Sequence, residues 1–225
     1  LSAIAVGLFS LISLKAEDRP NIVFFLVDDL GWSDVGCNGS PFYDTPHIDQ
    51  LAAEGVRFTS AYAACHVCSP TRASILTGKY PATLNLTDWL NGRSDRPYQV
   101  LKNPDKAMAL DSAETTLAEA LKKEGYATAL FGKWHLGRDT TPTGHGFDVH
   151  VPYSVNSNLG RRGFHNPKDI PGLDGGEYVT DRLAELAAKY IDVNKDRPFL
   201  LYRSHFSVHD PIHGRPDLVE KYKKK

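Results

Sequence analysis

The stretch Cys68-Ser69-Pro70-Thr71-Arg72-Ala73-Ser74-Ile75-Leu76-Thr77-Gly78 combines a helix start with reactive side chains. Ser69 is a favourable N-cap, Pro70 suits the first helical position, and the residues that follow continue the helix. Cys68 is therefore expected just outside a helix N-terminus, where free N–H groups and the helix dipole favour an anion. Arg72, one turn later, can point back to the same end. A modifiable side chain and a cation at a helix N-terminus suit a tetrahedral oxyanion.

The pattern Cys-x-Pro-x-Arg followed by Ala-Ser-x-Leu-Thr-Gly resembles the signature of the type I sulfatases, an arylsulfatase-like family of the alkaline-phosphatase-like superfamily. In that family the cysteine is oxidised to formylglycine, whose hydrated aldehyde attacks the sulfur of a sulfate ester. The resemblance implies this modification at Cys68, made by a formylglycine-generating maturation enzyme. The family usually has Ser before the Arg, whereas this chain has Thr71, which keeps the hydroxyl and adds a methyl group.

A second interpretation of the same stretch is a cysteine pair. Cys65 and Cys68 form Cys-x-x-Cys, which is typical of a redox centre or of half a zinc site. The third cysteine, Cys37, stands alone, so the sequence has no second pair of this kind. A disulfide or redox pair therefore stays open as the alternative to a nucleophile.

The bulk composition is that of an ordinary globular protein. The 225 residues are 41% hydrophobic and 24% charged, with a formal net charge of −1. Without a basic excess, the charge predicts no nucleic-acid partner. Residues 1–14 form an apolar run that is too short to span a bilayer and fits a secretory signal peptide. We therefore predict a partial signal peptide over residues 1–16, export to the periplasm or the exterior, and no stable membrane insertion after cleavage.

A candidate metal site follows the first apolar run. Residues 21–27, Asn-Ile-Val-Phe-Phe-Leu-Val, predict a strand buried on both faces, as in a parallel sheet. Asp28 and Asp29 come next, at the edge where open α/β sheets bind ligands. Two adjacent carboxylates favour a bound cation, although Asp28 could also be a helix cap, and their hard oxygens suit Ca²⁺ or Mg²⁺ better than zinc. By the resemblance, both aspartates bind a metal, usually Ca²⁺ with Mg²⁺ as the alternative, and the modified Cys68 lies beside it.

Two further apolar runs are predicted to be strands that end in reactive side chains. The run at 126–131 leads into Gly-Lys-Trp-His-x-Gly, where the alternate residues Lys133 and His135 can face one side. The run at 198–204 leads into a histidine-rich segment that contains His209 before an Asp-Pro pair. The Gly-Lys-Trp-His-x-Gly string resembles the second sulfatase signature, and His209 matches the family histidine on the leaving-group side.

The resemblance implies a nucleophilic attack followed by an elimination. One hydroxyl of the hydrated formylglycine at Cys68 attacks sulfur and expels the alcohol, and loss of a proton from the second hydroxyl then releases sulfate. Arg72, Lys133 and the metal stabilise the charge on the sulfate oxygens. His135 contacts the formylglycine hydroxyl and assists proton removal, and His209 hydrogen-bonds or protonates the departing oxygen.

Strand and helix patterns alternate along the chain. Helices are predicted over residues 45–55, 115–124 and 177–193, a further strand over 56–63, and irregular segments over 82–112 and 138–176. This alternation predicts an α/β fold with a predominantly parallel sheet and helices on both faces.

Two further expectations concern how much of a catalytic domain the sequence contains and which class of function it has. We interpret residues 17–225 as the N-terminal part of a sulfatase catalytic domain that is incomplete at its C-terminus. Ca²⁺ takes roughly six to eight oxygens, so we expect residues 17–225 alone to bind it weakly and to hydrolyse no sulfate ester. The expected substrate is a sulfated small molecule or a sulfated carbohydrate. A phosphatase or phosphonate hydrolase of the same superfamily, and a non-catalytic binding module or inactive fragment, are the alternatives.

Overall fold

The computed structural model describes residues 19–152, 178–210, 212 and 214–225. The signal peptide predicted over residues 1–16 lies outside the described residues. Within the described ranges, no helix is both long enough and apolar enough to cross a bilayer.

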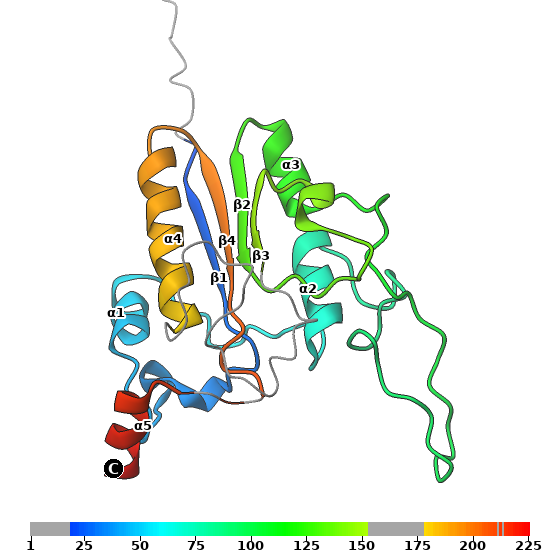
Figure 1. The fold of residues 1–225 in the computed structure, drawn as a ribbon, viewed down its shortest axis with the longest axis horizontal. Helices are drawn as coiled ribbons and strands as arrows, with labels where there is room; N and C mark the ends of the chain where they lie inside the picture. Colours follow the sequence, from blue (N-terminus) through cyan, green and yellow to red (C-terminus); the bar gives the residue numbers. More distant parts are fainter. Residues whose placement is uncertain (1–18, 153–177, 211, 213) are drawn as a thin grey trace, which may run out of the picture.

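One parallel sheet organises the chain (Figure 1). Its strands are β1 (Ile22–Leu26), β2 (Ala127–Gly132), β3 (Val149–Pro152) and β4 (Phe199–Ser204). Their order is β1-β4-β2-β3, and each neighbouring pair runs parallel. The three predicted strands are confirmed to within one or two residues at their ends, whereas β3 is an addition that the sequence analysis did not predict.

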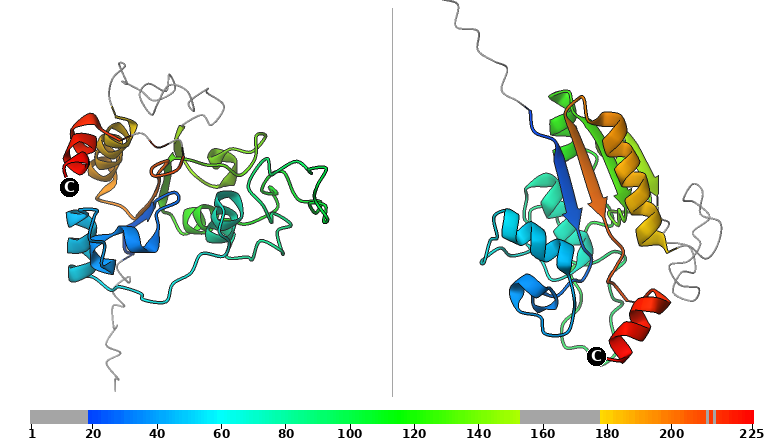
Figure 2. Two further views of the ribbon diagram at one scale, coloured as in Figure 1. Left: turned by 90° about the horizontal axis from the view of Figure 1, so that it is seen from below. Right: turned by 90° about the vertical axis from the view of Figure 1, so that its left-hand side faces the viewer.

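Helices cover both faces of the sheet, as predicted (Figure 2). On one face, Ala187 of α4 (Val179–Asn194) packs with Phe131 and Leu201 of the strands. On the other, Ala73 of α2 (Cys68–Thr77) and Ala118 of α3 (Leu117–Lys123) pack in one cluster with strand residues. Successive strand residues point to opposite faces, so the two central strands, β2 and β4, contribute to both clusters.

Local capping explains where α3 begins. Thr116 and Glu119 form a capping box at the start of α3, since each side chain accepts a hydrogen bond from the other residue's N–H. The remaining elements are α1 (Pro46–Glu54), α5 (Pro216–Lys223) and the 3₁₀ helices η1 (Trp32–Asp34), η2 (Gly36–Asn38) and η3 (Pro142–His145).

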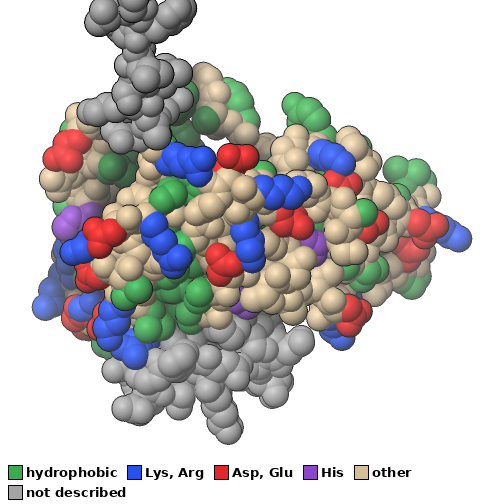
Figure 3. Space-filling view, turned by 90° about the horizontal axis from the view of Figure 1, so that it is seen from above, with side chains coloured by type: hydrophobic (Ala, Val, Ile, Leu, Met, Phe, Trp, Pro, Cys, Tyr) green, Lys and Arg blue, Asp and Glu red, His purple; other side chains and the backbone are tan. Residues whose placement is uncertain are grey.

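On the surface at the end where the strands begin, basic and acidic side chains are intermixed (Figure 3).

Two strand predictions need correction. Residues 56–63 are irregular, because they pair with no strand of the described sheet and so lack a ladder of hydrogen bonds. β1 is a strand, but it is not buried on both faces, since Val23 and Phe25 are 51% and 59% exposed. The cause is position: β1 lies at the edge of the described sheet, and α4 packs against β2 and β4.

Gly132 permits the close approach of β2 to the end of β4. It has φ 114°, and a Cβ at this position would lie 1.8 Å from the carbonyl oxygen of Ser204. We expect Gly132→Ala to lower the free energy of unfolding by more than about 2 kcal/mol, because a left-handed conformation and a backbone clash both oppose the side chain. Denaturant titration measures the change.

Gly39→Ala is the matched control. Gly39 also has a positive φ, of 96°, but a Cβ there would meet nothing within 4 Å. Its expected cost is therefore only the conformational part, about 1 kcal/mol. Equal losses in the two variants would contradict the role assigned to the strand contact.

Candidate active site

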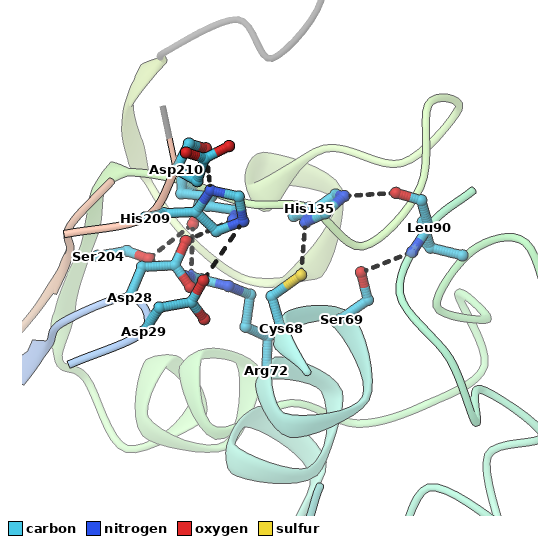
Figure 4. A network of polar contacts seen from close by, with 11 residues as sticks. Asp28, Asp29, Cys68, Ser69, Arg72, Leu90, His135, Ser204, His209 and Asp210 are labelled. Carbon is cyan, nitrogen blue, oxygen red and sulfur yellow. Dashed lines mark hydrogen bonds and ion pairs between the residues drawn. The ribbon is translucent and has the colours of Figure 1, made fainter. Parts of the chain in front are cut away.

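The carboxyl ends of three strands and the start of α2 meet at one edge of the sheet (Figure 4). The main chain ties these ends together: the N–H of Lys133 donates to the Ser204 carbonyl at 3.0 Å, and the N–H of Val208 donates to the Asp28 carbonyl at 2.8 Å. The structure therefore brings together residues that are more than 60 positions apart in the sequence. Parallel strands make this convergence, because all of their carboxyl ends lie on the same side.

Asp28 is the buried acid at the centre of the site. Its side chain is 5% exposed, and one oxygen lies 3.3 Å from a guanidinium nitrogen of Arg72 while the other accepts from the ammonium of Lys133. Burial raises the pKa of Asp28, but the charges of Arg72 and Lys133 outweigh this and hold the pKa below its ordinary value of 3.8. One ionised carboxylate thus faces two cations, which leaves the cluster with a net positive charge.

Arg72 is held by more than its ion pair. It is 3% exposed, and its guanidinium donates to the Lys133 carbonyl at 3.1 Å and to the hydroxyl of Ser204. The Ser204 hydroxyl in turn donates to the same carbonyl at 2.7 Å. Ser204 was not among the predicted site residues. Its sequence signal is slight: a hydroxyl at the last position of an otherwise apolar strand.

Cys68 is the first residue of α2, and Val67 is the N-cap. The predicted N-cap role of Ser69 is therefore wrong. Ser69 is fully buried in the first turn, and its hydroxyl accepts a hydrogen bond from the N–H of Leu90 at 3.1 Å instead of capping the helix. A tertiary contact has taken the hydroxyl that the sequence pattern assigned to the helix end. Cys65 and Cys68 are both free thiols.

His135 lies between the thiol and the main chain of Leu90. Its Nδ1 is 3.2 Å from Cys68 Sγ, and its Nε2 is 2.6 Å from the Leu90 carbonyl oxygen. Burial, followed by the charge of Lys133, lowers the pKa of His135 to about 4. The imidazole is therefore neutral at ordinary pH. Because a carbonyl oxygen only accepts, Nε2 carries the hydrogen and Nδ1 is left as an acceptor facing the thiol.

Asp29 and His209 form the outer rim of the site. The side chain of Asp29 is 52% exposed, and its Oδ2 lies 3.6 Å from Nε2 of His209, which is itself 40% exposed. The other ring nitrogen of His209 contacts the carbonyl of Asp210. In Figure 4 His209 lies above Asp28 and Arg72, and Asp29 lies next to Asp28. A ligand can therefore reach Asp29 and His209 without disturbing the core.

His205 does not join the site. It is 7% exposed and its ring packs on Phe25 with centroids 4.3 Å apart. Burial, followed by the charge of Arg203, lowers the pKa of His205 to about 3. Its role is structural packing at the end of β4. His213, the other histidine near this segment, lies outside the described residues.

The acidic residues fit a hard cation in type but supply only part of a coordination shell. Asp28 and Asp29 offer carboxylate oxygens, which Ca²⁺ and Mg²⁺ prefer. In the part of the chain that the structure describes, no group of three or more His, Cys, Asp and Glu side chains is arranged to hold a metal ion. Asp28 already faces two cations, whereas Asp29 is half-exposed and lies beside His209.

Comparison with known proteins identifies the family. The Sulfatase family model matches residues 20–225. The chain is 33% identical over 235 residues to the N-acetylgalactosamine-6-sulfatase of Mus musculus, covering 94% of this chain and 44% of that protein. It is 40% identical over 228 residues to the arylsulfatase A of Bos taurus, covering 88% and 43%. The chain therefore belongs to the sulfatase family, and it spans less than half the length of these curated relatives.

Solved structures resemble the fold. The structure of Ps i-CgsB matches with a TM-score of 0.71 and 28% identity, covering 92% of this chain and 49% of that one. The structure of BT4656 in complex with its substrate D-glucosamine-2-N,6-O-disulfate matches with a TM-score of 0.69 and 27% identity, covering 92% and 38%. These similarities agree with the α/β fold and its parallel sheet.

The buried acid makes a prediction about stability. We expect Asp28→Asn to lower the free energy of unfolding by about 3 kcal/mol, because it leaves Arg72 and Lys133 buried beside a neutral amide. Asp29→Asn makes the same chemical change at a half-exposed position and should cost less than about 1 kcal/mol. Denaturant titration of both variants at neutral pH measures the difference. Similar losses in the two variants would show that Asp28 is not the acid on which the cluster depends.

Proposed function

We propose that this member of the sulfatase family hydrolyses sulfate esters with a formylglycine made from Cys68 as the nucleophile. The observation that carries the proposal is the surroundings of Cys68: a helix N-terminus, the buried cation pair Arg72 and Lys133, and the neutral acceptor His135. Such surroundings suit a group that must bind an anion and then lose a proton.

The cations supply the electrostatic part of the reaction. Arg72 and Lys133 share one carboxylate, so the cluster keeps a positive charge that a sulfate group can neutralise. Both side chains are fixed by hydrogen bonds before substrate binds, and they need little reorganisation as negative charge grows on the sulfate oxygens. Preorganised donors of this kind are commonly a large contribution to rate.

His135 supplies the proton acceptor. The sulfur of Cys68 stands where the hydroxyls of the hydrated formylglycine would begin, and Nδ1 of His135 lies 3.2 Å from it. In the first step a diol hydroxyl loses its proton to solvent as its oxygen bonds to sulfur, the ester S–O bond breaks, and His209 donates a proton to the departing oxygen. In the second step Nδ1 takes the proton of the remaining hydroxyl, the C–O bond to sulfate breaks, and the aldehyde returns.

A divalent cation, Ca²⁺ or alternatively Mg²⁺, fits this site in part. Asp28 and Asp29 would hold it, with the modified side chain of Cys68 beside it and the other ligands supplied from outside the described residues. When bound, the ion would add positive charge for the sulfate oxygens and the nucleophile.

The proposed substrate class is a sulfated carbohydrate. Support comes from the names of similar proteins: a relative is an N-acetylgalactosamine-6-sulfatase, and BT4656 was solved with a disulfated glucosamine. A sulfated aryl alcohol is the second candidate, because other relatives are arylsulfatases. For the natural protein we further propose export and maturation by a formylglycine-generating enzyme.

The test of the nucleophile is chemical and kinetic. In a host with the maturation enzyme, mass spectrometry of the peptide that contains Cys68 should find the aldehyde. The natural protein should then hydrolyse sulfate esters faster than phosphate esters in one preparation. Cys68→Ala should lower kcat/KM by at least about 10³-fold, because the nucleophile is lost. Quantitative recovery of the unmodified thiol, or a preference for phosphate, would contradict the proposal.

Metal dependence is tested separately. Stringent chelation should remove activity, and added Ca²⁺ or Mg²⁺ should restore it. Asp29→Asn should raise the Kd for Ca²⁺ by about tenfold or more while leaving the fold intact, because it removes a charged ligand at a half-exposed position. Isothermal titration calorimetry measures the change. Unchanged turnover after chelation would remove the metal from the mechanism.

A further inference from the structure

A chain of hydrogen bonds links Ser69 on α2 to His135 through the main chain of Leu90 (Figure 4). We infer that Ser69 is a positioning residue that fixes the tautomer of His135 and so keeps Nδ1 available as the proton acceptor. The catalytic consequence rests on the proposed function, whereas the tautomer itself can be tested without turnover.

Leu90 makes one main-chain hydrogen bond to each of the two side chains that it links. The N–H of Leu90 donates to the Ser69 hydroxyl at 3.1 Å, and the carbonyl of the same residue lies 2.6 Å from Nε2 of His135. Ser69 is fully buried and Leu90 is 7% exposed, so water cannot readily replace either bond. Losing the hydroxyl would leave a buried N–H without its acceptor, which is costly.

The carbonyl decides which nitrogen carries the hydrogen. A neutral imidazole has one N–H and one bare nitrogen, and a carbonyl oxygen can only accept. With Nε2 facing the Leu90 carbonyl, the hydrogen must lie on Nε2 and the lone pair on Nδ1, which faces Cys68 Sγ at 3.2 Å. In the opposite tautomer Nδ1 would donate, and it could not take a proton from a group at residue 68.

The segment before Leu90 is anchored from its other side. Leu86 is fully buried, and the ammonium of Lys106 donates to the Trp89 carbonyl at 3.0 Å and pairs with Asp88 at 3.4 Å. These contacts hold residues 86–89, but none of them reaches the N–H of Leu90. The N–H of Leu90 belongs to the same peptide as the Trp89 carbonyl, and Ser69 accepts from it, so Ser69 holds the residue whose carbonyl faces His135.

Helix α2 does not need the hydroxyl for its own stability. Val67 is its N-cap, and no side chain caps its first turn. Ser74, in the same helix, has a buried hydroxyl with no hydrogen-bond partner among the described residues. Ser74 therefore provides a matched control for removing a serine hydroxyl from α2.

The direct experiment reads the tautomer of His135 by ¹⁵N NMR of the imidazole ring in the natural protein at neutral pH, because protonated and bare ring nitrogens have distinct shifts. The His135→Gln variant assigns the signal. We expect the hydrogen on Nε2 in the unsubstituted protein. Finding it on Nδ1 there would overturn the inference, whether or not any variant folds.

The variants then test the role of Ser69. Ser69→Ala should give a mixture of tautomers and lower kcat by about fivefold to tenfold, the effect of one lost hydrogen bond, with KM changed by less than about twofold. Rates are normalised to the aldehyde content of residue 68, so that altered maturation is not counted. Ser69→Thr, which keeps the hydroxyl, should restore both readouts, and Ser74→Ala should change neither.

Each contrary result is decisive. An unchanged tautomer and kcat in Ser69→Ala would overturn the inference, as would an equal loss of kcat in Ser74→Ala. If no preparation turns over a sulfate ester, the proposed function fails, while the NMR result still decides the tautomer.

Discussion

The buried carboxylate of Asp28, held between Arg72 and Lys133, is the interaction on which the site depends. It joins the end of β1, the first turns of α2 and the end of β2, three segments that local structure alone would not bring together. Each charge is almost fully buried, so no member can lose its partner without leaving a charge uncompensated. The ion cluster therefore fixes the geometry of the sheet edge as well as its positive potential.

Serine hydroxyl groups add hydrogen bonds that orient the residues around the ion cluster. Ser204 connects the guanidinium of Arg72 to the main chain at Lys133, and Ser69 connects α2 to Leu90, whose carbonyl contacts His135. Charged residues thus provide the chemistry, while small neutral residues set their orientation. Asp28, Arg72 and Lys133 together form a positively charged floor of the site, next to the neutral imidazole of His135. This combination suits binding an anion and removing a proton at one point.

Most of this arrangement could be predicted from the sequence, because it follows from strands and their ends. Apolar runs located β1, β2 and β4, and the parallel order placed the residues after them on one edge. The missed features depend on tertiary partners: β3 has four residues and little pattern of its own, and residues 56–63 alternate without a strand to pair with. The contact of Leu90 is made by its main chain, which leaves no trace in the side-chain pattern.

The site divides into a buried floor and an exposed rim, and this division separates stability from ligand binding. Asp28, Arg72 and Lys133 are each less than 6% exposed at their side chains, whereas Asp29 and His209 are 52% and 40% exposed. A cation or a substrate can therefore reach the rim while the floor keeps its ion pairs. The floor is part of the packed core, so its ion pairs are held in place by the fold itself. Asp29 and His209 lie on the rim, where movement costs the fold little.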